Sequence, residues 1–422
     1  MPRAYGVLVS RLTDVARFAG QLYGARAAVA WRGYVRRTPL AMLELRAGRA
    51  DPYRVYDRIR AAGALTPTPL GNWASASHDV CSAVLRDRRF GVRLADEPPG
   101  AVTEEPNLSF LEMDPPDHTR LRRLAAPAFS ARRVAGYRPL VERTVDRLLD
   151  DAVRLGSFDL VDTVAAPLPV AVIIDLLGVP PEEAGTLTRH GTVIGSALDG
   201  VRSLGHARAL MASNRELREM FARVFELRRR QPGEDLISGL LQAEGSQVMP
   251  EELVPMCTLL LIAGFETTVN LIGNGTLALM GHPEQWRLLH EAPSLATSAV
   301  EEMLRYDPPV QRTARVAQQE LELAGRCVRR NQVVLTLLGG ANRDPSAFPE
   351  PDRFDITRTP AAENLAFSSG IHYCLGAPLA RMEAAVLFEA LAGRLPGLRL
   401  AGRAVRRPGR TIRGPLHLPV SC

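Results

Sequence analysis

Apolar residues recur every three to four positions along much of the chain, which is the spacing of one helix face and predicts helices. One such run opens at Ala377-Pro378, continues to Leu391 and is followed by Gly393. Proline in a first turn and glycine near a last turn are start and stop signals, so a helix is expected between them. A second long helix is expected from Pro250, because two acids follow this proline at the positive end of the helix dipole.

Glycine and proline divide the rest of the chain. Helical segments are expected from about residue 118 to 230, separated at Gly156, at Gly178 to Pro181 and at Pro232-Gly233. The segment from Gly91 to Asn107 is rich in glycine, proline and acidic residues, which predicts a long loop. Residues 328 to 334 are expected to form two short strands about a turn.

Residues 1 to 50 are expected to form an amphipathic extension. Apolar side chains have roughly helical spacing there and are interrupted by arginine: Val7, Leu8, Val15, Phe18, Leu22 and Tyr23. Such a segment either packs on the domain or touches a membrane surface, and we favour packing. Its start lacks the apolar core and cleavage site of a signal peptide. No uninterrupted apolar stretch approaches the roughly 18 residues of a membrane span, so no transmembrane segment is expected.

Composition narrows the function. All 52 basic residues are arginine, and the net charge of +6 is spread along a chain of 422 residues. Because no arginine tract is interleaved with aromatic residues, we expect no nucleic-acid partner, and a basic face toward an acidic protein fits better. The 5 cysteines are widely separated and form no C-x-x-C pair, which argues against a disulfide framework or a zinc ribbon. A cytoplasmic location fits.

Cys374 is the principal candidate for chemistry. It lies between Gly370 and Gly376, directly before the helix expected from Ala377. Unpaired backbone N–H groups at a helix start stabilise a thiolate and lower its pKa, which suits the residue to metal ligation. The two glycines leave room for a flat macrocycle close to the backbone. A buried structural thiol beside a surface His372 is the alternative.

The run from Phe367 to Gly376 resembles the heme-ligating signature of the cytochromes P450, F-x-x-G-x-H-x-C-x-G. The resemblance covers about residues 51 to 422. It implies a mainly α fold with a small β portion, in which one large helical domain carries a β-rich lobe. It also implies heme b as cofactor, Cys374 as axial ligand of the iron, and Phe367, His372 and Gly376 as parts of the heme-binding loop.

Other segments fit the same family. Residues 51 to 90 resemble its first helix and sheet entry, with 72 to 75 as a short strand, and residues 413 to 420 resemble its final hairpin. The family counterpart of the loop from Gly91 to Asn107 covers the substrate, and residues 188 to 210 resemble the substrate lid. Ser368 stands where the family often has glycine.

The stretch from Ala263 to Thr268 is the second signature. It follows four apolar residues inside the helix that begins at Pro250, so Glu266 and Thr267 are expected in a buried helix, where they need partners or a task. By resemblance this is the oxygen-activating helix: Ala263 and Gly264 open a groove, and Thr267 and Glu266 deliver protons. Alternatively, Thr267 only donates a hydrogen bond to the carbonyl of Ala263.

Glu302 and Arg305 form an E-x-x-R motif with i, i+3 spacing, which places both side chains on one helix face. The resemblance adds Arg353 as their partner and gives the cluster a structural role in the heme-bearing core.

Four further residues are assigned by resemblance to the heme propionates as cationic donors: His118, Arg122, Arg315 and His372. Arginine suits a carboxylate because its planar fork donates two parallel hydrogen bonds. Arg312 lies close enough in sequence to exchange roles with Arg315. A solvated charged face is the alternative for His118 and Arg122.

Taken together, these features predict a monomeric bacterial monooxygenase that inserts one oxygen atom of O2 into an apolar small molecule by hydroxylation or epoxidation. A polyketide or peptide-like substrate of secondary metabolism is expected. Because the chain has no nucleotide-binding glycine motif and no ferredoxin-like cysteine set, electrons are expected from NAD(P)H through a separate ferredoxin and ferredoxin reductase. A basic patch would dock the ferredoxin: Arg122, Arg123, Arg132 and Arg133. A peroxide-using peroxygenase and a non-catalytic heme-binding or zinc-binding protein are the alternatives.

Overall fold

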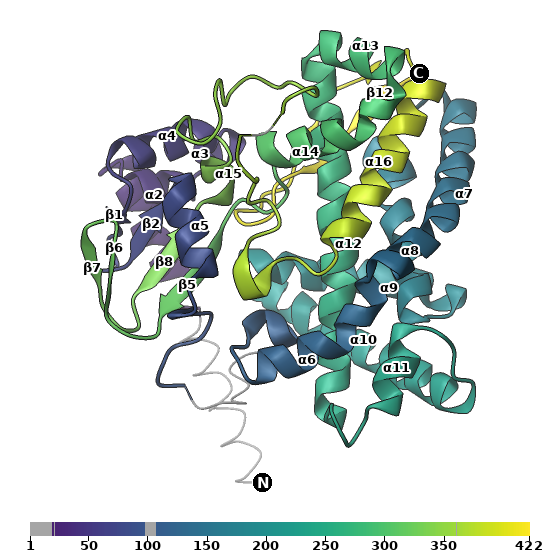
Figure 1. The fold of residues 1–422 in the computed structure, drawn as a ribbon, viewed down its shortest axis with the longest axis horizontal. Helices are drawn as coiled ribbons and strands as arrows, with labels where there is room; N and C mark the ends of the chain where they lie inside the picture. The colour runs from purple at the N-terminus through teal and green to yellow at the C-terminus, as the bar shows by residue number, and fades with distance from the viewer. Residues whose placement is uncertain (1–18, 21, 98–106, 360) are drawn as a thin grey trace.

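Helix α12 (Pro250–Gly281) runs through the middle of the computed structural model of the chain (Figure 1). The structure describes residues 19–20, 22–97, 107–359 and 361–422. Most helices surround α12, and a lobe at one side carries the first helices and most of the sheet structure. This arrangement confirms the predicted mainly α fold with a small β portion.

The elements follow in chain order. Residues 22–34 are helical. The further α-helices are α2 (Pro39–Met42), α3 (Arg46–Ala50), α4 (Tyr53–Ala61), α5 (His78–Arg86), α6 (Asp117–Ala125), α7 (Ala131–Leu155), α8 (Pro167–Leu177), α9 (Ala184–Gly195), α10 (Leu204–Arg230), α11 (Leu236–Gln242), α12, α13 (Pro283–Glu291), α14 (Ala296–Tyr306), α15 (Leu338–Ala341) and α16 (Ala377–Arg394). Short 3-10 or π turns are η1 (Ser109–Glu112), η2 (Ala126–Phe129), η3 (Val161–Ala165), η4 (Pro181–Glu183), η5 (Ser196–Asp199), η6 (Pro293–Leu295) and η7 (Gly370–His372).

The strands are short and lie in four sheets. They are β1 (Thr66–Pro67), β2 (Trp73–Ser75), β3 (Phe90–Gly91), β4 (Ser157–Asp159), β5 (Thr313–Ala317), β6 (Leu321–Leu323), β7 (Arg326–Val328), β8 (Val333–Thr336), β9 (Arg399–Leu400), β10 (Val405–Arg406), β11 (Pro415–His417) and β12 (Pro419–Ser421). The largest sheet has the order β1-β2-β8-β5-β3, in which only β2 and β8 pair in parallel.

Several sequence signals are confirmed where they fall. Helix α12 begins at Pro250, and the Glu252 carboxylate accepts the backbone N–H of Met249 at 2.8 Å, which satisfies a donor at the helix start. Arg120 of α6 reaches the same carboxylate at 2.6 Å and ties α6 to α12. Gly178 ends α8 with a φ of 78°, in the left-handed region that favours glycine.

Two strand expectations need correction. Residues 328 and 333 do end and begin strands about a turn, but β7 pairs with β6, whereas β8 pairs with β2 and β5. The prediction of a final hairpin at residues 413 to 420 is wrong, because β11 and β12 do not pair with each other. Strand β11 pairs with β10, and β12 pairs with β4 and β9. Local sequence marks strands but does not choose their partners, which packing of distant segments decides.

Helix α12 is long and apolar enough to cross a membrane by length and composition, with a mean hydropathy of 1.5 in its most apolar window. That window is 83% buried inside the protein, which is the condition of a core helix. It is the one such helix in the described part of the chain.

The first 50 residues divide into two parts. Of the residues of this extension that the structure describes, 39–50 lie against the domain: Leu43 packs in a small core with Tyr56 and Ile59. Residues 22–34 form a largely exposed helix. Most of the apolar positions named in the sequence, and residues 98–106 of the predicted loop, lie outside the described residues. A boundary at residue 50 therefore stays a prediction.

Candidate active site

The loop that presents Cys374 folds back on itself before α16. The backbone N–H of Cys374 donates to the carbonyl of Phe367 at 2.9 Å. The turn η7 lies between them, and α16 begins three residues after the cysteine, as the proline signal predicted. The guanidinium of Arg381 lies 4.5 Å from the centroid of the Phe367 ring and holds this ring at the side of the loop.

The expected thiolate is not favoured by the protein alone. Backbone N–H groups of Gly376 and Ala377 and the charge of Arg122 do lower the pKa of the Cys374 thiol, but burial outweighs them and the pKa is raised. The groups at the helix start therefore lower the pKa of the thiol as predicted, but burial has the larger effect and was not foreseen. A thiolate at this position needs a positive charge beside it, which a metal cation provides.

The two glycines of the cysteine loop, Gly370 and Gly376, differ in what a side chain at their position would contact. Gly370 has a φ of 68°, and a Cβ there would lie 2.1 Å from the carbonyl oxygen of Leu85 in α5, so α5 itself excludes a side chain. A Cβ on Gly376 would lie 3.7 Å from the nearest atom, on Phe129, which is ordinary contact. Ser368, where the family often has glycine, has a positive φ of 62°. Contact with α5 thus suffices to explain Gly370, whereas no protein atom requires glycine at position 376.

Three distant elements bring four basic side chains together at this loop. The His118 ring of α6 lies 4.3 Å from the His372 ring, centroid to centroid. Arg122, one turn after His118, donates to the Tyr373 carbonyl at 2.5 Å. Arg315 of β5 reaches the hydroxyl of Ser368 at 3.5 Å. The solvated-face alternative for His118 is excluded, because its side chain is 2% exposed.

Arg315, not Arg312, belongs to this group. Arg312 donates to the carboxylate of Glu44 at 2.9 Å and so takes part in a different cluster. Burial lowers the pKa of Arg315 to about 10, which still leaves it charged at neutral pH. Among the described residues no carboxylate forms an ion pair with Arg122 or Arg315.

The assignment of His118 and His372 as cationic donors to the propionates stays a prediction, and the surrounding protein by itself disfavours the charged form of both rings. Burial and the charge of Arg315 lower the pKa of His372 to about 3, and burial beside Arg122 also lowers the pKa of His118. Each ring can still donate one N–H. Both ring nitrogens of His118 and Nε2 of His372 are buried without a hydrogen-bond partner, an arrangement that costs free energy unless a ligand supplies acceptors.

Ala263 and Thr267 mark a solvent-accessible space, the hollow, beside α12 at the second signature. Ala263 is exposed and Thr267 half-exposed, although nearly every other residue around them on this core helix is buried. The Thr267 hydroxyl donates to the Ala263 carbonyl at 2.9 Å, so the alternative bond is present; its lone pairs stay free toward the hollow. Gly264 faces α8, where a Cβ would lie 2.8 Å from Ile173, so its small size allows helix packing.

Glu266 is buried, and its partner is a residue that the sequence analysis missed. The guanidinium of Arg407 binds one carboxylate oxygen of Glu266, and the other, Oε2, is buried without a hydrogen-bond partner. Burial raises the pKa of Glu266 despite this arginine. Arg407 follows β10, and Asp199 of η5 accepts the backbone N–H groups of Arg410 and Thr411 at 2.6 Å each. The sequence offered one signal for such a partner, which is the high density of arginine between residues 403 and 413.

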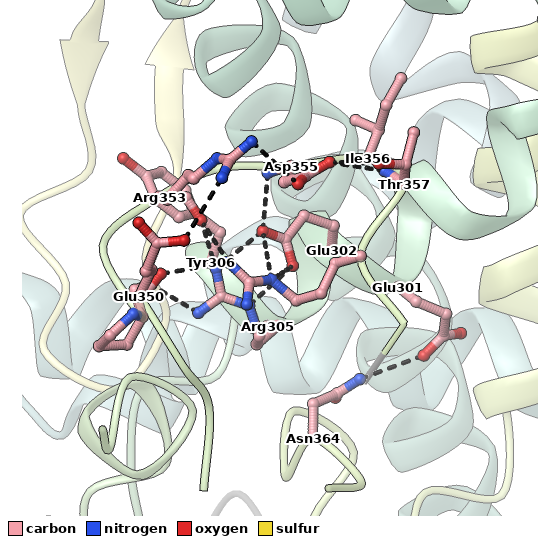
Figure 2. A network of polar contacts seen from close by, with 12 residues as sticks. Glu301, Glu302, Arg305, Tyr306, Glu350, Arg353, Asp355, Ile356, Thr357 and Asn364 are labelled. Carbon is pink, nitrogen blue, oxygen red and sulfur yellow. Dashed lines mark hydrogen bonds and ion pairs between the residues drawn. The ribbon is translucent and has the colours of Figure 1, made fainter. Parts of the chain in front are cut away.

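Figure 2 shows a buried ion network around Glu302 and Arg305. Through Asn342 this network is connected to the segment just before the cysteine loop. Arg305 donates from Nε and from one terminal nitrogen to both oxygens of Glu302, at 2.7 and 2.8 Å. Its other terminal nitrogen donates to the Asn342 carbonyl at 3.1 Å. The side chain of Asn342 in turn accepts the backbone N–H of Leu365 at 2.7 Å, two residues before Phe367.

The third partner of this network was predicted wrongly. The Arg353 side chain is exposed and pairs with Glu350 and Asp355, at 3.3 and 3.5 Å (Figure 2). Only its carbonyl accepts Arg305, at 3.0 Å. Arg358 instead brings a guanidinium to Glu302, with Nε 3.2 Å from Oε2. Arg353 follows the turn at residues 351–352 and Arg358 follows the turn at residues 356–357, and the sequence does not show which of the two guanidinium groups faces Glu302.

Comparison with known proteins agrees with this geometry. The cytochrome P450 family matches residues 205–392. The chain is 38% identical over 405 residues to the 6-deoxyerythronolide B hydroxylase of Saccharopolyspora erythraea, covering 91% of this chain and 99% of the relative. It is 41% identical over 386 residues to the cytochrome P450 monooxygenase PikC of Streptomyces venezuelae, covering 88% of this chain and 91% of the relative.

A solved structure agrees in fold. The cytochrome P450 PksS of the bacillaene polyketide synthase of Bacillus subtilis 168 superposes with a TM-score of 0.80 at 34% identity, over 90% of this chain and 98% of that chain. Identity at this level across nearly whole chains shows common descent as well as common fold. The chain therefore belongs to the cytochrome P450 family and is a heme-dependent monooxygenase.

Proposed function

We propose that Cys374 is the axial ligand of heme b and that His118, Arg122, Arg315 and His372 hold its propionates. The observation that carries this proposal is the meeting of α6, β5 and the cysteine loop. Two charged guanidinium groups and two buried imidazoles converge there, with no ion-paired carboxylate among the described residues. Two carboxylates would supply the acceptors that the imidazoles lack. Phe367 and Gly376 complete the loop.

When bound, heme supplies the oxygen chemistry, and the protein supplies position and protons. We propose that Thr267 and Glu266 move protons in the hollow beside Ala263. The Thr267 hydroxyl is placed there and can accept a hydrogen bond from water while it donates to the Ala263 carbonyl, so it can position a water molecule that carries a proton. Glu266 holds a proton more readily than an exposed acid because its pKa is raised. Release of Oε1 from Arg407, or exchange of the two oxygens, would let Glu266 pass that proton on.

The first test is the absorption spectrum of the reduced, carbon-monoxide-bound protein. Wild-type protein is expected to show the band that gives the family its name, because thiolate ligation produces it. Cys374→Ala should lose the band, and Cys257→Ala, which alters another buried thiol, should keep it. A well-folded wild-type protein without the band would overturn the assignment of Cys374.

Electrons for the reaction are proposed to come from NAD(P)H through a separate ferredoxin and its reductase. Of the predicted basic patch, Arg122 is turned into the site and Arg133 pairs with Glu234 at 3.6 Å. Arg123 and Arg132 stay exposed and have no ion pair in the described part of the chain. Charge reversal at both should slow reduction by ferredoxin and weaken its salt dependence. An unchanged rate at low and high salt would remove the patch from the proposal.

The substrate is proposed to be an apolar polyketide or peptide-like molecule that is hydroxylated or epoxidised. The names of two relatives support this class: one is a hydroxylase of 6-deoxyerythronolide B, and one is the cytochrome P450 of a polyketide synthase. A panel of such compounds, screened by the spectral shift of the heme, tests it. We further propose a monomer in the cytoplasm, which agrees with the free thiols of all described cysteines.

The intact Glu266-Thr267 pair favours the monooxygenase over a peroxide-using peroxygenase, which needs no proton delivery to dioxygen. Turnover with NAD(P)H and redox proteins, compared with turnover on peroxide alone, separates the two. A non-catalytic heme-binding role would leave the hollow beside Ala263 without a purpose.

A further inference from the structure

The helical residues 22–34 turn an apolar face to solvent. Three large side chains of this helix are exposed, as is the residue that follows it: Tyr23 at 48%, Trp31 at 50%, Tyr34 at 68% and Val35 at 65%. Positions 23, 27, 31 and 34 follow one another at three- and four-residue steps, so they share one side of the helix. A helix of a globular protein normally turns such a face to the core.

A different side of this helix contacts the protein. Gly33 is buried, and a Cβ there would lie 2.8 Å from the side chain of Leu45 and 3.1 Å from the carbonyl oxygen of Ala41. Two turns earlier on the same side, the guanidinium of Arg26 donates to the backbone carbonyl of Arg202. These contacts at two points fix which face is turned outward. The exposure of Trp31 and Tyr34 therefore follows from how the helix docks.

The charge of the segment has one sign. Between residues 22 and 43 the chain contains no acid and four bases: Arg26, Arg32, Arg36 and Arg37. No carboxylate of the described residues forms an ion pair with any of them. The Arg36 guanidinium lies 4.8 Å from the centroid of the Trp31 ring, so positive charge stands directly beside the apolar face. Cation and aromatic ring together suit an anionic, partly apolar surface.

We propose that this face, formed by Tyr23, Ala27, Trp31, Tyr34 and Val35, lies on the surface of a membrane that contains anionic lipids. Tyrosine and tryptophan place an apolar ring and a polar tip at the level of lipid headgroups. Arginine at the flanks reaches lipid phosphates while its stem stays against apolar surface. The described residues 22–34 span about 20 Å along the helix. Two of them, Arg26 and Arg32, are charged, which disfavours a position across the bilayer core, so the proposal places this helix on the membrane surface.

An acidic protein would also match the charge, but the geometry favours lipid. The face is a continuous strip of rings and small apolar groups, and the described part of it carries no amide or carboxylate that would fix the register of a protein partner. A lipid surface needs no register. The sequence favoured packing of this extension on the domain. Burial of the aromatic face in that way would require Trp31 and Tyr34 to point toward the domain, whereas both are exposed.

Sedimentation with lipid vesicles tests the proposal, using the full-length heme-loaded protein. Vesicles of phosphatidylcholine with phosphatidylglycerol are compared with vesicles of phosphatidylcholine alone, at low and high salt. We expect binding to the anionic vesicles that weakens with salt. Trp31→Ser with Tyr34→Ser should lower the affinity by about tenfold or more, because two interfacial rings are lost. Met211→Ser, at an exposed apolar position of α10, should bind as wild type.

Fluorescence locates the contact. Brominated lipids in the anionic vesicles should quench Trp31, and Trp31→Phe should lose the quenched component while it keeps binding. Circular dichroism and the heme spectrum check that each variant is folded. Three outcomes would overturn the proposal: no binding, binding that survives the double substitution, and self-association of the free protein that the double substitution abolishes. The last would assign the face to a second copy of the chain.

Discussion

The guanidinium of Arg358 reaches the carboxylate of Glu302, with Nε 3.2 Å from Oε2, and thereby completes the ion network that begins at Arg305. Arg353, five residues earlier, contributes its carbonyl and turns its side chain to Glu350 and Asp355. Because the network ends at the cysteine loop, its loss should affect heme retention as well as stability.

Substitution of the two arginines should separate their roles. Arg358→Ala removes a cation from a buried carboxylate, so we expect a loss of about 1 to 3 kcal/mol in the free energy of unfolding and a lower heme content. Arg353→Ala should change stability by less than about 0.5 kcal/mol, because its side chain is exposed. Urea unfolding midpoints and the ratio of heme to protein measure both effects. Equal losses in the two variants would show that the network has been misassigned.

Removal of Glu302 or Arg305 should be more severe. Each side chain is 2% exposed, and its loss leaves the other as an unpaired buried charge at a cost of about 3 to 5 kcal/mol. We expect Glu302→Ala and Arg305→Ala to give heme-free or insoluble protein. Normal heme incorporation in either variant contradicts this prediction.

Alanine at the two loop glycines should separate fold from cofactor. Gly370→Ala brings a Cβ into the Leu85 carbonyl at a positive φ, so the apoprotein itself should be destabilised. Gly376→Ala meets nothing closer than 3.7 Å in the protein, so the apoprotein should keep its stability while heme affinity falls. Thermal unfolding of the apoprotein and heme titration measure the two quantities. Unaltered heme affinity in Gly376→Ala would place the cofactor away from this residue.

Neighbouring threonines of α12 offer a matched test of proton delivery. Both hydroxyls donate to the carbonyl four residues earlier, but Thr267 borders the hollow and Thr268 is 2% exposed. With a substrate from the spectral screen, Thr267→Ala should divert NAD(P)H electrons from product to peroxide. Thr268→Ala should keep the wild-type ratio of product to NAD(P)H. If the two variants couple equally well, the role of Thr267 is structural.

Glu383 of α16 should make stability depend on pH. Burial raises its pKa to about 8, and its Oε2 is buried without a hydrogen-bond partner. The unfolded chain releases this proton near the ordinary glutamate pKa of about 4.3, so between these values the folded state binds one proton more. The contribution of Glu383 to the free energy of unfolding is fully present below the pKa of the unfolded chain. It is lost at about 1.4 kcal/mol per pH unit as the pH rises toward the folded-state pKa of about 8.

Glu383→Gln should remove that dependence. We expect the variant and the wild type to unfold at similar urea concentrations near pH 5, and the variant to be the more stable near pH 8. Glu389→Gln, on the same helix, serves as the control because Glu389 is exposed. A wild-type midpoint that does not fall relative to Glu383→Gln would contradict the prediction.

Local sequence determined the helices and the identity of the metal ligand candidate. Proline and acids at Pro250, and proline after Ala377, mark helix starts because their physical effect is confined to one turn. Cys374 was found for the same reason, since its frame of glycine and helix start is contiguous in the chain. Spacing placed His118 and Arg122 on one helix face, whereas their assignment to the propionates came from the family resemblance.

Tertiary structure decided what depends on burial and on distant partners. The lowered pKa values of His118 and His372, and the raised pKa of the Cys374 thiol, come mainly from desolvation, which no local motif encodes. Packing also chose Arg358 over Arg353 for Glu302 and brought Arg407 to Glu266 across 141 residues of chain. Sequence order sets which groups a segment can offer, whereas free energies of burial and long-range contact set which of them meet.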